Sequence, residues 1–258
     1  MSLRLAVLQT PGDLGDGTAR LTWLDARLGG LAGKADLVLC PELFAIGYNI
    51  GHAVRARAEP ADGAIASALS NLAERHAIAV HCGFAEAAAG RIFNAVQCYG
   101  PNGRRLLHQR KLAIPPGAER DNFSAGEGCA LFELNGLRIA SLICYDIEFV
   151  EPARHVAALG ADLILVPTAL GAQWAWVART MVPSRAYENG VYLAYANHCG
   201  DEGGLAFLGE SFIAAPDGEE LARAGRKEEV LLAEIDPARV RKARDRLPYL
   251  RDHATLRF

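Results

Sequence analysis

The 258-residue sequence predicts one domain of the mixed α/β class, in which helices flank a mixed sheet or two sheets. Two segments, 161–167 and 191–197, are almost continuously apolar, which is typical of strands buried in a parallel sheet. Elsewhere, tight turns separate short apolar runs and indicate antiparallel hairpins. No low-complexity linker or 20–50-residue repeat divides the chain, so we expect a single domain over residues 1–258.

The first half of the chain combines βαβ units with a hairpin. Strand-length apolar runs predict the strands, and apolar residues at helical spacing predict the helices. The turn at 100–103, with sequence GPNG, joins two of the strands. In chain order we expect a strand at 3–9, a helix at 18–32, a strand at 35–40, a helix at 62–76 and strands at 78–84, 92–100 and 105–111.

The second half begins with a hairpin around Asn135-Gly136, the strongest short hairpin signal. A Pro-Asp-Gly turn at 216–218 ends a later strand. In chain order we expect strands at 129–134 and 137–144, a helix at 150–159, a strand at 161–167, a helix at 172–189, strands at 191–197, from 210 and at 229–235, and a helix at 237–246.

Composition excludes several classes of protein. The net charge is −3, with no long run of one sign, which argues against a nucleic-acid surface or a polybasic membrane patch. No window approaches the ~18–20 apolar residues of a membrane span, and the start does not resemble a signal peptide. We therefore expect a cytoplasmic protein. The six cysteines form no C-x-x-C pair and are expected to be free thiols, and the histidine spacing predicts no zinc site.

Cys144 stands where an apolar run, 139–143, gives way to a polar turn. A cysteine used only for packing would lie inside the run. A nucleophile, in contrast, must be held rigidly and still be exposed, and it needs a base and an oxyanion stabiliser. The backbone N–H of Tyr145, in the turn, is a candidate oxyanion donor. Histidine is the usual base, but neither His155 nor His198 lies in a local pattern that marks it as one.

Glu42 and Lys111 also follow predicted strands. Glu42 has apolar neighbours, and partial desolvation would raise its pKa toward that of a general base. Lys111 offers a cation that could stabilise a thiolate or an oxyanion. Taken singly, each is more simply a turn carboxylate or a solvated lysine. Together with Cys144 they occupy the carboxyl ends of three buried strands, where functional groups collect in α/β sheets.

Three motifs resemble the nitrilase superfamily of carbon–nitrogen hydrolases: LCPELFAIGY, HQRKLAIP and LICYDIEFVEPAR. They occur in the family's order, and the resemblance covers essentially the whole chain. It implies a four-layer α-β-β-α sandwich and a Glu-Lys-Cys triad formed by Glu42, Lys111 and Cys144. It also implies a second glutamate, Glu119, that orients Lys111 or the substrate amide. Lys111 and the Tyr145 N–H would stabilise the oxyanion.

The resemblance implies hydrolysis of a non-peptide carbon–nitrogen bond through a cysteine thioester, with water as the second reactant and no metal or organic cofactor. True nitrilases typically have Trp-Glu after the cysteine, whereas this chain has Tyr145-Asp146, as in amidases and carbamoylases. We expect a small primary carboxamide, aliphatic or derived from an amino acid. An N-carbamoyl amine or amino acid is the alternative substrate. A nitrilase, an inactive scaffold and a Cys-His hydrolase of another α/β fold are further alternatives.

Two loops, 168–176 and 197–204, are expected to form the substrate pocket. Acidic residues 201 and 202 would suit an amine-bearing substrate, although a solvated loop is the simpler interpretation. Arg179 and Arg185 would suit a carboxylate, although surface or ion-paired positions are simpler. The pocket candidates are Tyr48, Ala169, Trp174 and His198, with Trp176 as a second possible aromatic wall.

The family resemblance also implies pairing of two copies through helices. The segments 150–159 and 172–189 are the candidates, because the second is more apolar than a solvated helix requires. The tail at 247–258 is expected to reach a partner in such a homodimer or higher oligomer.

Overall fold

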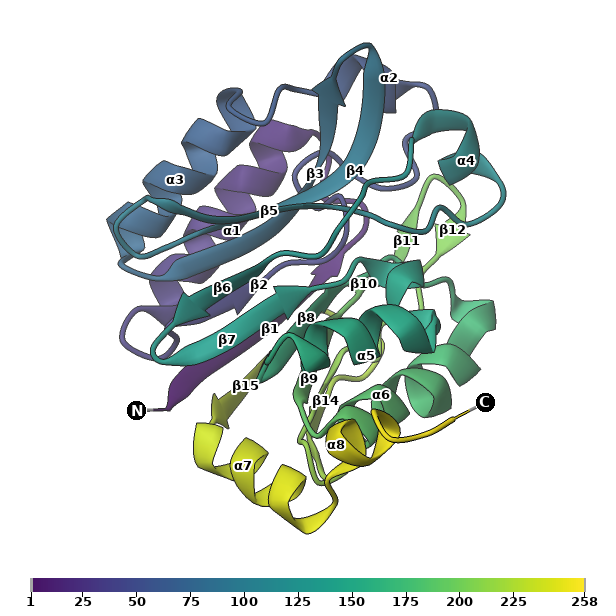
Figure 1. The fold of residues 1–258 in the computed structure, drawn as a ribbon. Helices are drawn as coiled ribbons and strands as arrows, with labels where there is room; N and C mark the ends of the chain where they lie inside the picture. Colours follow the sequence, from purple (N-terminus) through teal and green to yellow (C-terminus); the bar gives the residue numbers. More distant parts are fainter. Residues whose placement is uncertain (1, 258) are drawn as a thin grey trace.

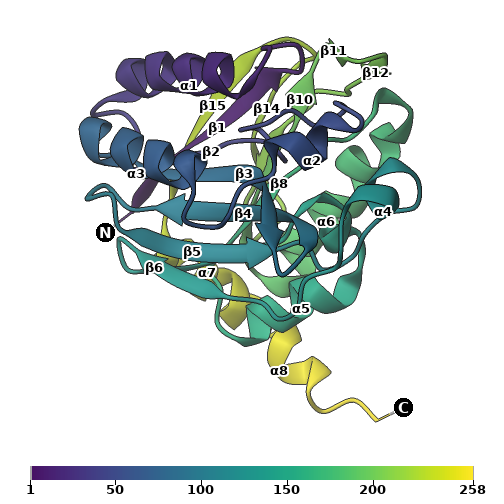
Figure 2. The same cartoon turned by 90° about the horizontal axis from the view of Figure 1, so that it is seen from above.

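The computed structural model describes residues 2–257. Two mixed sheets pack face to face, and helices cover both outer faces (Figures 1 and 2). This arrangement confirms the predicted α/β class and the four-layer α-β-β-α sandwich.

The first sheet has a parallel centre and antiparallel flanks. Strands β1, β2 and β3 run parallel, while β4, β5 and β15 pair antiparallel with their neighbours. The order is β10-β1-β2-β3-β4-β5, with β15 also on β1. Its strands are β1 (Leu3–Pro11), β2 (Leu37–Leu39), β3 (Ala79–Ala88), β4 (Arg91–Tyr99), β5 (Arg105–Arg110), β10 (His198–Cys199) and β15 (Glu229–Ile235).

The second sheet has the same kind of organisation, in the order β14-β13-β9-β8-β7-β6. Asn135 and Gly136 both have positive φ, 49° and 77°, as a type I′ turn requires, and they join β6 to β7 as predicted. Its strands are β6 (Leu131–Leu134), β7 (Leu137–Ser141), β8 (Leu163–Pro167), β9 (Tyr192–Ala196), β13 (Phe212–Ala214) and β14 (Glu220–Arg223). A separate small hairpin consists of β11 (Asp201–Glu202) and β12 (Leu205–Ala206).

Helices α1 (Gly17–Leu31) and α3 (Ala64–His76) cover the first sheet, and α5 (Val150–Ala158) and α6 (Val182–Asn189) cover the second (Figure 2). The C-terminal helices α7 (Pro237–Arg246) and α8 (Tyr249–His253) follow β15. Three helices of five residues each were not predicted, because five residues are too few to establish a helical period. They are α2 (Ala53–Arg57), α4 (Ala118–Asn122) and α8.

Strand β1 shows how alternation builds the layers. Leu3, Leu5 and Val7 pack in the core between the two sheets, while Ala6 and Leu8 pack toward the helices on the other face. Successive side chains of a strand point to opposite faces, so an apolar strand supplies two cores at once. This explains why the central strands read as continuous apolar runs.

Two predicted elements differ in the structure. The expected helix at 172–189 consists of a 3-10 turn (Ala172–Trp174), a π-helical turn (Val177–Met181) and α6. Pro183, in the first turn of α6, has no N–H to continue a regular helix from the preceding turn. The expected strand at 137–144 ends at Ser141, because the N–H of Ile143 is bonded to the Asp146 carboxylate instead of a neighbouring strand.

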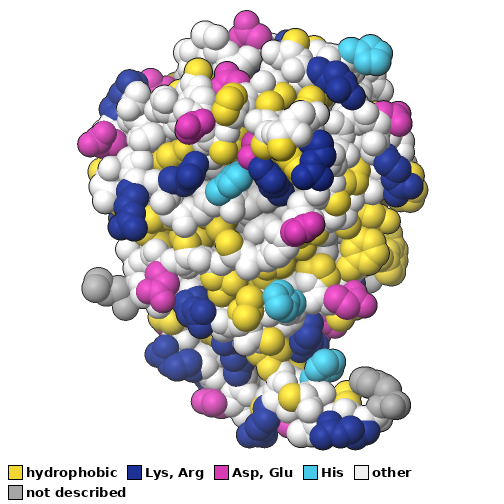
Figure 3. All heavy atoms as spheres, turned by 45° about the horizontal axis from the view of Figure 1, so that its top comes forward, with side chains coloured by type: hydrophobic (Ala, Val, Ile, Leu, Met, Phe, Trp, Pro, Cys, Tyr) yellow, Lys and Arg dark blue, Asp and Glu magenta, His cyan; other side chains and the backbone are white. Residues whose placement is uncertain are grey.

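Within residues 2–257, the helices lack the combined length and apolar content needed to cross a bilayer. On the face drawn in Figure 3, basic and acidic side chains are interspersed among apolar ones.

Candidate active site

A buried cluster of charges lies where the first two motifs meet. The Nζ of Lys111, which follows β5, is 2.7 Å from Glu42 Oε1 and 2.8 and 2.7 Å from the two carboxylate oxygens of Glu119. The side chains of Lys111 and Glu42 are fully buried, and that of Glu119 is 7% exposed. A lysine ammonium has three N–H donors, so these contacts occupy all of them.

Asn94 on β4 completes this cluster, and the sequence reasoning missed it. Its Nδ2 donates to Glu42 Oε1 at 2.7 Å and to Glu119 Oε2 at 3.3 Å. The other carboxylate oxygen of Glu42 is buried and has no hydrogen-bond partner within residues 2–257. The available signal was an amide inside an apolar strand, since buried polar groups are almost always bonded.

Burial raises the pKa of the Glu42 carboxyl to about 7, although the charge of Lys111 opposes this shift. Burial alone would lower the pKa of Lys111, but the carboxylates of Glu42 and Glu119 outweigh it and raise that pKa. Glu42 can therefore both accept and return a proton near neutral pH, while Lys111 remains a fixed cation.

Cys144 begins a 3-10 turn and has a φ of +47°, a region that non-glycine residues rarely adopt. Asp146 holds this turn in place. Its carboxylate accepts hydrogen bonds from the backbone N–H groups of Ile143, Leu112 and Ala113. The last two follow Lys111, so Asp146 ties the cysteine turn to the segment that carries the lysine.

Thr168 contacts the sulfur directly. Its hydroxyl donates to Cys144 Sγ at 2.9 Å. Burial and the charge of Glu42 raise the pKa of the Cys144 thiol well above its ordinary value, while Lys111 and the Thr168 hydrogen bond lower it. The thiol is thus protonated at rest and requires a base.

The Tyr145 N–H lies in the first turn of the 3-10 helix. The first backbone bond of that turn joins the next N–H, of Asp146, to Ile143 O at 3.0 Å. N–H groups at the start of a helix have no intrahelical acceptor, so the Tyr145 N–H is available to another acceptor.

A cavity of about 390 Å³ opens at Cys144 and Glu119. Three of the predicted pocket residues, Tyr48, Ala169 and Trp174, line it. The hydroxyl of Tyr48 donates to Glu119 at 2.7 Å. The remaining lining residues are Pro115, Pro116, Tyr145, Glu148, Leu170, Gly171, Gln173, Val177 and Leu205.

His198 does not line this cavity, so its prediction as a pocket residue was wrong. It is fully buried, and its Nε2–H donates to the backbone oxygen of Glu42 at 2.8 Å, while Nδ1 accepts from Thr10. Burial lowers the pKa of His198 to about 3, so the ring is neutral. Within residues 2–257 no histidine hydrogen-bonds to Cys144, which contradicts the Cys-His alternative.

The loop at 197–204 was expected to be solvated, but the structure buries part of it. Glu202 is buried and forms an ion pair with Arg20 at 2.5 Å. Its other oxygen accepts from the backbone N–H groups of Tyr48 and Asn49. Of the two acidic residues in the loop, Asp201 is exposed and Glu202 is not. Glu202 therefore fixes the position of Tyr48 and is not available to a substrate.

Arg179 and Arg185 are engaged in structural contacts. Arg179 forms a two-bond ion pair with Glu210. Arg185 is buried, forms an ion pair with Glu188 and donates to the backbone oxygens of Ile147 and Glu148. Both agree with the simpler of the two sequence interpretations.

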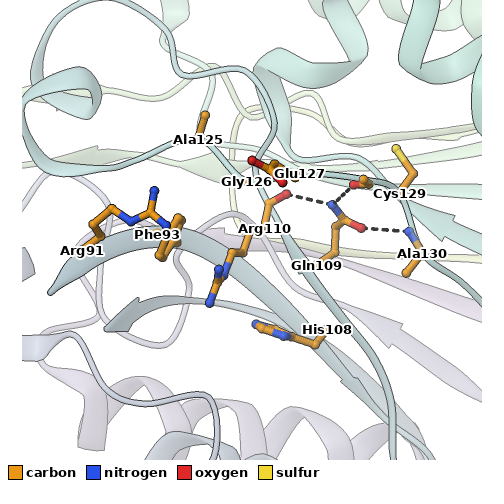
Figure 4. A pocket seen from close by; sticks show the side chains of 11 residues that line it. Arg91, Phe93, His108, Gln109, Arg110, Ala125, Gly126, Glu127, Cys129 and Ala130 are labelled. Carbon is orange, nitrogen blue, oxygen red and sulfur yellow. Dashed lines mark hydrogen bonds between the residues drawn. The ribbon is translucent and has the colours of Figure 1, made fainter. Parts of the chain in front are cut away.

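A second cavity, of about 570 Å³, lies over β4 and β5 and is shown in Figure 4. Arg91 and Arg110 both lie against the ring of Phe93, and Arg110 is paired with Glu86. Cys129 lines this cavity, and burial raises the pKa of its thiol, which is therefore protonated. His108, Gln109 and Arg110 of the second motif line this cavity, but Glu42, Lys111 and Cys144 do not.

Residues 4–245 match the family model described as carbon-nitrogen hydrolase. The chain belongs to this family. Among curated proteins it is 43% identical to "Hydrolase in pqqF 5'region" of Pseudomonas protegens, over 86% of this chain and 79% of that protein. It is 32% identical to an (R)-stereoselective amidase of a Pseudomonas species, over 97% and 91%. The family expected from the motifs, and an enzyme of the amidase type, are confirmed.

Solved structures agree with this assignment. An amidase from a Nesterenkonia species superposes with a TM-score of 0.85 at 31% identity, covering 95% of each chain. A cysteine-to-alanine mutant of the amidase from Nesterenkonia sp. AN1 was solved in complex with butyramide, also with a TM-score of 0.85. It is 31% identical, over 97% of this chain and 96% of that chain.

Proposed function

We propose that this carbon–nitrogen hydrolase converts a small primary carboxamide into a carboxylic acid and ammonia, with Cys144 as the nucleophile. The observation that carries the proposal is the position of Cys144 in the wall of a cavity that also contains Glu119 of the buried charge cluster. A cavity with a thiol and an ionisable cluster suits acyl transfer.

In the first half of the reaction, Glu42 takes the Sγ proton as the sulfur of Cys144 attacks the carbonyl carbon. The unpartnered oxygen of Glu42 and its pKa of about 7 support this role. Negative charge develops on the carbonyl oxygen and is stabilised by the Tyr145 N–H and by Lys111. Because Lys111 already donates three hydrogen bonds to carboxylates, it acts through its charge, or after releasing one bond to Glu119.

The tetrahedral intermediate then collapses. Glu42 gives its proton to the nitrogen, the C–N bond breaks, ammonia leaves and a thioester on Cys144 remains. A water molecule loses a proton to Glu42 as it attacks the thioester carbon. The C–S bond breaks, the thiol regains the proton, and the carboxylic acid is released. Glu119 keeps Lys111 oriented throughout, and Tyr48 and Asn94 hold Glu119.

The test is ammonia release from butyramide by wild type and Cys144→Ala. We expect turnover by wild type and, because no nucleophile remains, a loss of at least about 10⁴-fold in the variant. Cys129→Ala is the matched control, since Cys129 is a half-buried thiol outside the cavity. Equal activity of Cys144→Ala and wild type would refute the role of Cys144.

We also propose that the chain forms a homodimer through α5, α6 and the tail at 247–258. The support is that six large apolar side chains in or next to these segments are 38–54% exposed. They are Phe149, Val150, Leu159, Tyr187, Tyr249 and Leu256. Phe258 lies outside the described residues. Light scattering after size-exclusion chromatography measures the mass of the protein in solution and so tests the homodimer. A cytoplasmic location stays a prediction.

A further inference from the structure

Among the described residues, the charged side chains that line the cavity are acidic. Among the described residues that line it are two carboxylates, Glu119 and Glu148, and no lysine, arginine or histidine. Glu119 is engaged by Lys111 and Tyr48. The carboxylate of Glu148, in contrast, makes no hydrogen bond or ion pair with any residue in the range 2–257.

Glu148 belongs to the same short turn as the nucleophile. Cys144, Tyr145 and Glu148 all face the cavity, whereas Asp146 points away to the backbone after Lys111. Arg185 donates to the backbone oxygen of Glu148, which fixes the end of the turn and leaves the carboxylate unpaired. The turn thus holds a free carboxylate in the same cavity as the sulfur.

The buried cluster supplies no net positive charge to compensate, because it pairs one lysine with two glutamates. The cation of Lys111 lies between the carboxyl groups of Glu42 and Glu119, and its three donors are bonded to them. Burial raises the pKa of Glu148, although the charge of Lys111 opposes the shift, as expected for a carboxylate that lacks a partner. A cationic group on the substrate would supply that partner, and an anionic group would meet only repulsion.

We propose that Glu148 sets the charge selectivity of the site, favouring amides whose acyl chain carries an ammonium group and rejecting those whose acyl chain carries a carboxylate. This inference rests on the proposed amide hydrolysis at Cys144. It names the substrate class as neutral to cationic carboxamides, amino-acid-derived amides among them. Glu148 acts in recognition, and the chemical steps remain with the triad.

The test uses three primary amides of similar length: 4-aminobutyramide, butyramide and succinamate, which are cationic, neutral and anionic. We expect kcat/KM for ammonia release to fall in that order. In Glu148→Gln the ratio of kcat/KM for the cationic substrate to that for the neutral one should drop about fivefold, roughly the upper value of a solvent-accessible ion pair. The ratio of neutral to anionic substrate should drop as well. Glu148→Ala should change both ratios in the same direction.

Each ratio compares two substrates on one preparation, so a partly unfolded variant lowers both rates equally and leaves the ratio intact. Glu151→Gln is the matched control: this exposed glutamate is one turn away and does not line the cavity, and its ratios should equal those of wild type. If butyramide is hydrolysed through Cys144 but the ratios are flat, or unchanged in Glu148→Gln, the selectivity inference is overturned and the proposed function stands. If none of the three amides is hydrolysed, both are overturned.

Discussion

Strand β3 passes the turn that carries Glu42 so closely that a side chain at position 83 cannot fit without a shift of the backbone. A Cβ built on Gly83 would lie 2.5 Å from the backbone nitrogen of Leu43 and 3.2 Å from the carbonyl carbon of Glu42. These are backbone atoms, which cannot rotate away as the end of a flexible side chain can. Ordinary contact begins near 3.4 Å, so Gly83→Ala must move the Glu42 turn or β3 by ~0.9 Å.

Such a displacement has a large predicted effect on catalysis and a moderate one on stability. A misplacement of about 1 Å can lower the rate about 10²-fold, because the base no longer meets the thiol in the reactive geometry. Overpacking costs about 1–3 kcal/mol, and each kcal/mol lowers the melting temperature of a chain this size by about 2–4 °C. We therefore expect Gly83→Ala to fold, melt several degrees lower, and lose about 10²-fold in kcat/KM for butyramide.

The assay pairs ammonia release with thermal unfolding followed by circular dichroism. Gly30→Ala is the matched control, since Gly30 lies in α1 with open space around its added Cβ. Alanine in a helix is favoured over glycine by about 0.5–1 kcal/mol, so this variant should be as active as wild type and slightly more stable. A Gly83→Ala enzyme with wild-type kcat/KM would refute the close-approach reasoning.

Two further predictions concern proton transfer at the sulfur. The base must be ionised to accept a proton. We therefore expect kcat/KM for amide hydrolysis to rise with pH through an apparent pKa near 7, the value for Glu42, and then to level off. A profile already flat between pH 5 and 8 would contradict Glu42 as the base. Thr168→Val removes the hydroxyl that donates to Cys144 Sγ, so alkylation of Cys144 by iodoacetamide at neutral pH should slow about tenfold. The control variant Thr168→Ser keeps the hydroxyl and should react like wild type. Equal rates in all three proteins would exclude a role for the hydrogen bond.

Much of the fold followed from local pattern. Continuous apolar runs predicted the central strands, and Asn135-Gly136 predicted the β6–β7 hairpin, whose turn has the two positive φ angles of type I′. The failures are equally local in origin. Pro183 and the π-helical turn before it interrupt the helix expected at 172–189, and a hydrogen bond from Ile143 to Asp146 ends β7 early.

By itself, the sequence determined which residues stand at strand ends, and hence Glu42, Lys111 and Cys144 as candidates, because strand boundaries are encoded in short-range apolar and turn patterns. Only the tertiary structure decided their partners. Asn94 on β4 bonds to Glu42, and Thr168 after β8 bonds to Cys144. No sequence spacing relates these partners to the residues that they contact.

His198 is a residue whose surroundings differ from those that its sequence position suggested. Its place in a loop after a strand suggested a pocket residue, yet packing between β1 and the Glu42 turn buries it as a neutral structural donor. No sequence pattern singled out Glu148, and the fold leaves its carboxylate unpaired in the cavity. Whether a polar side chain is solvated, paired or left free depends on contacts between distant segments, which only the folded chain defines.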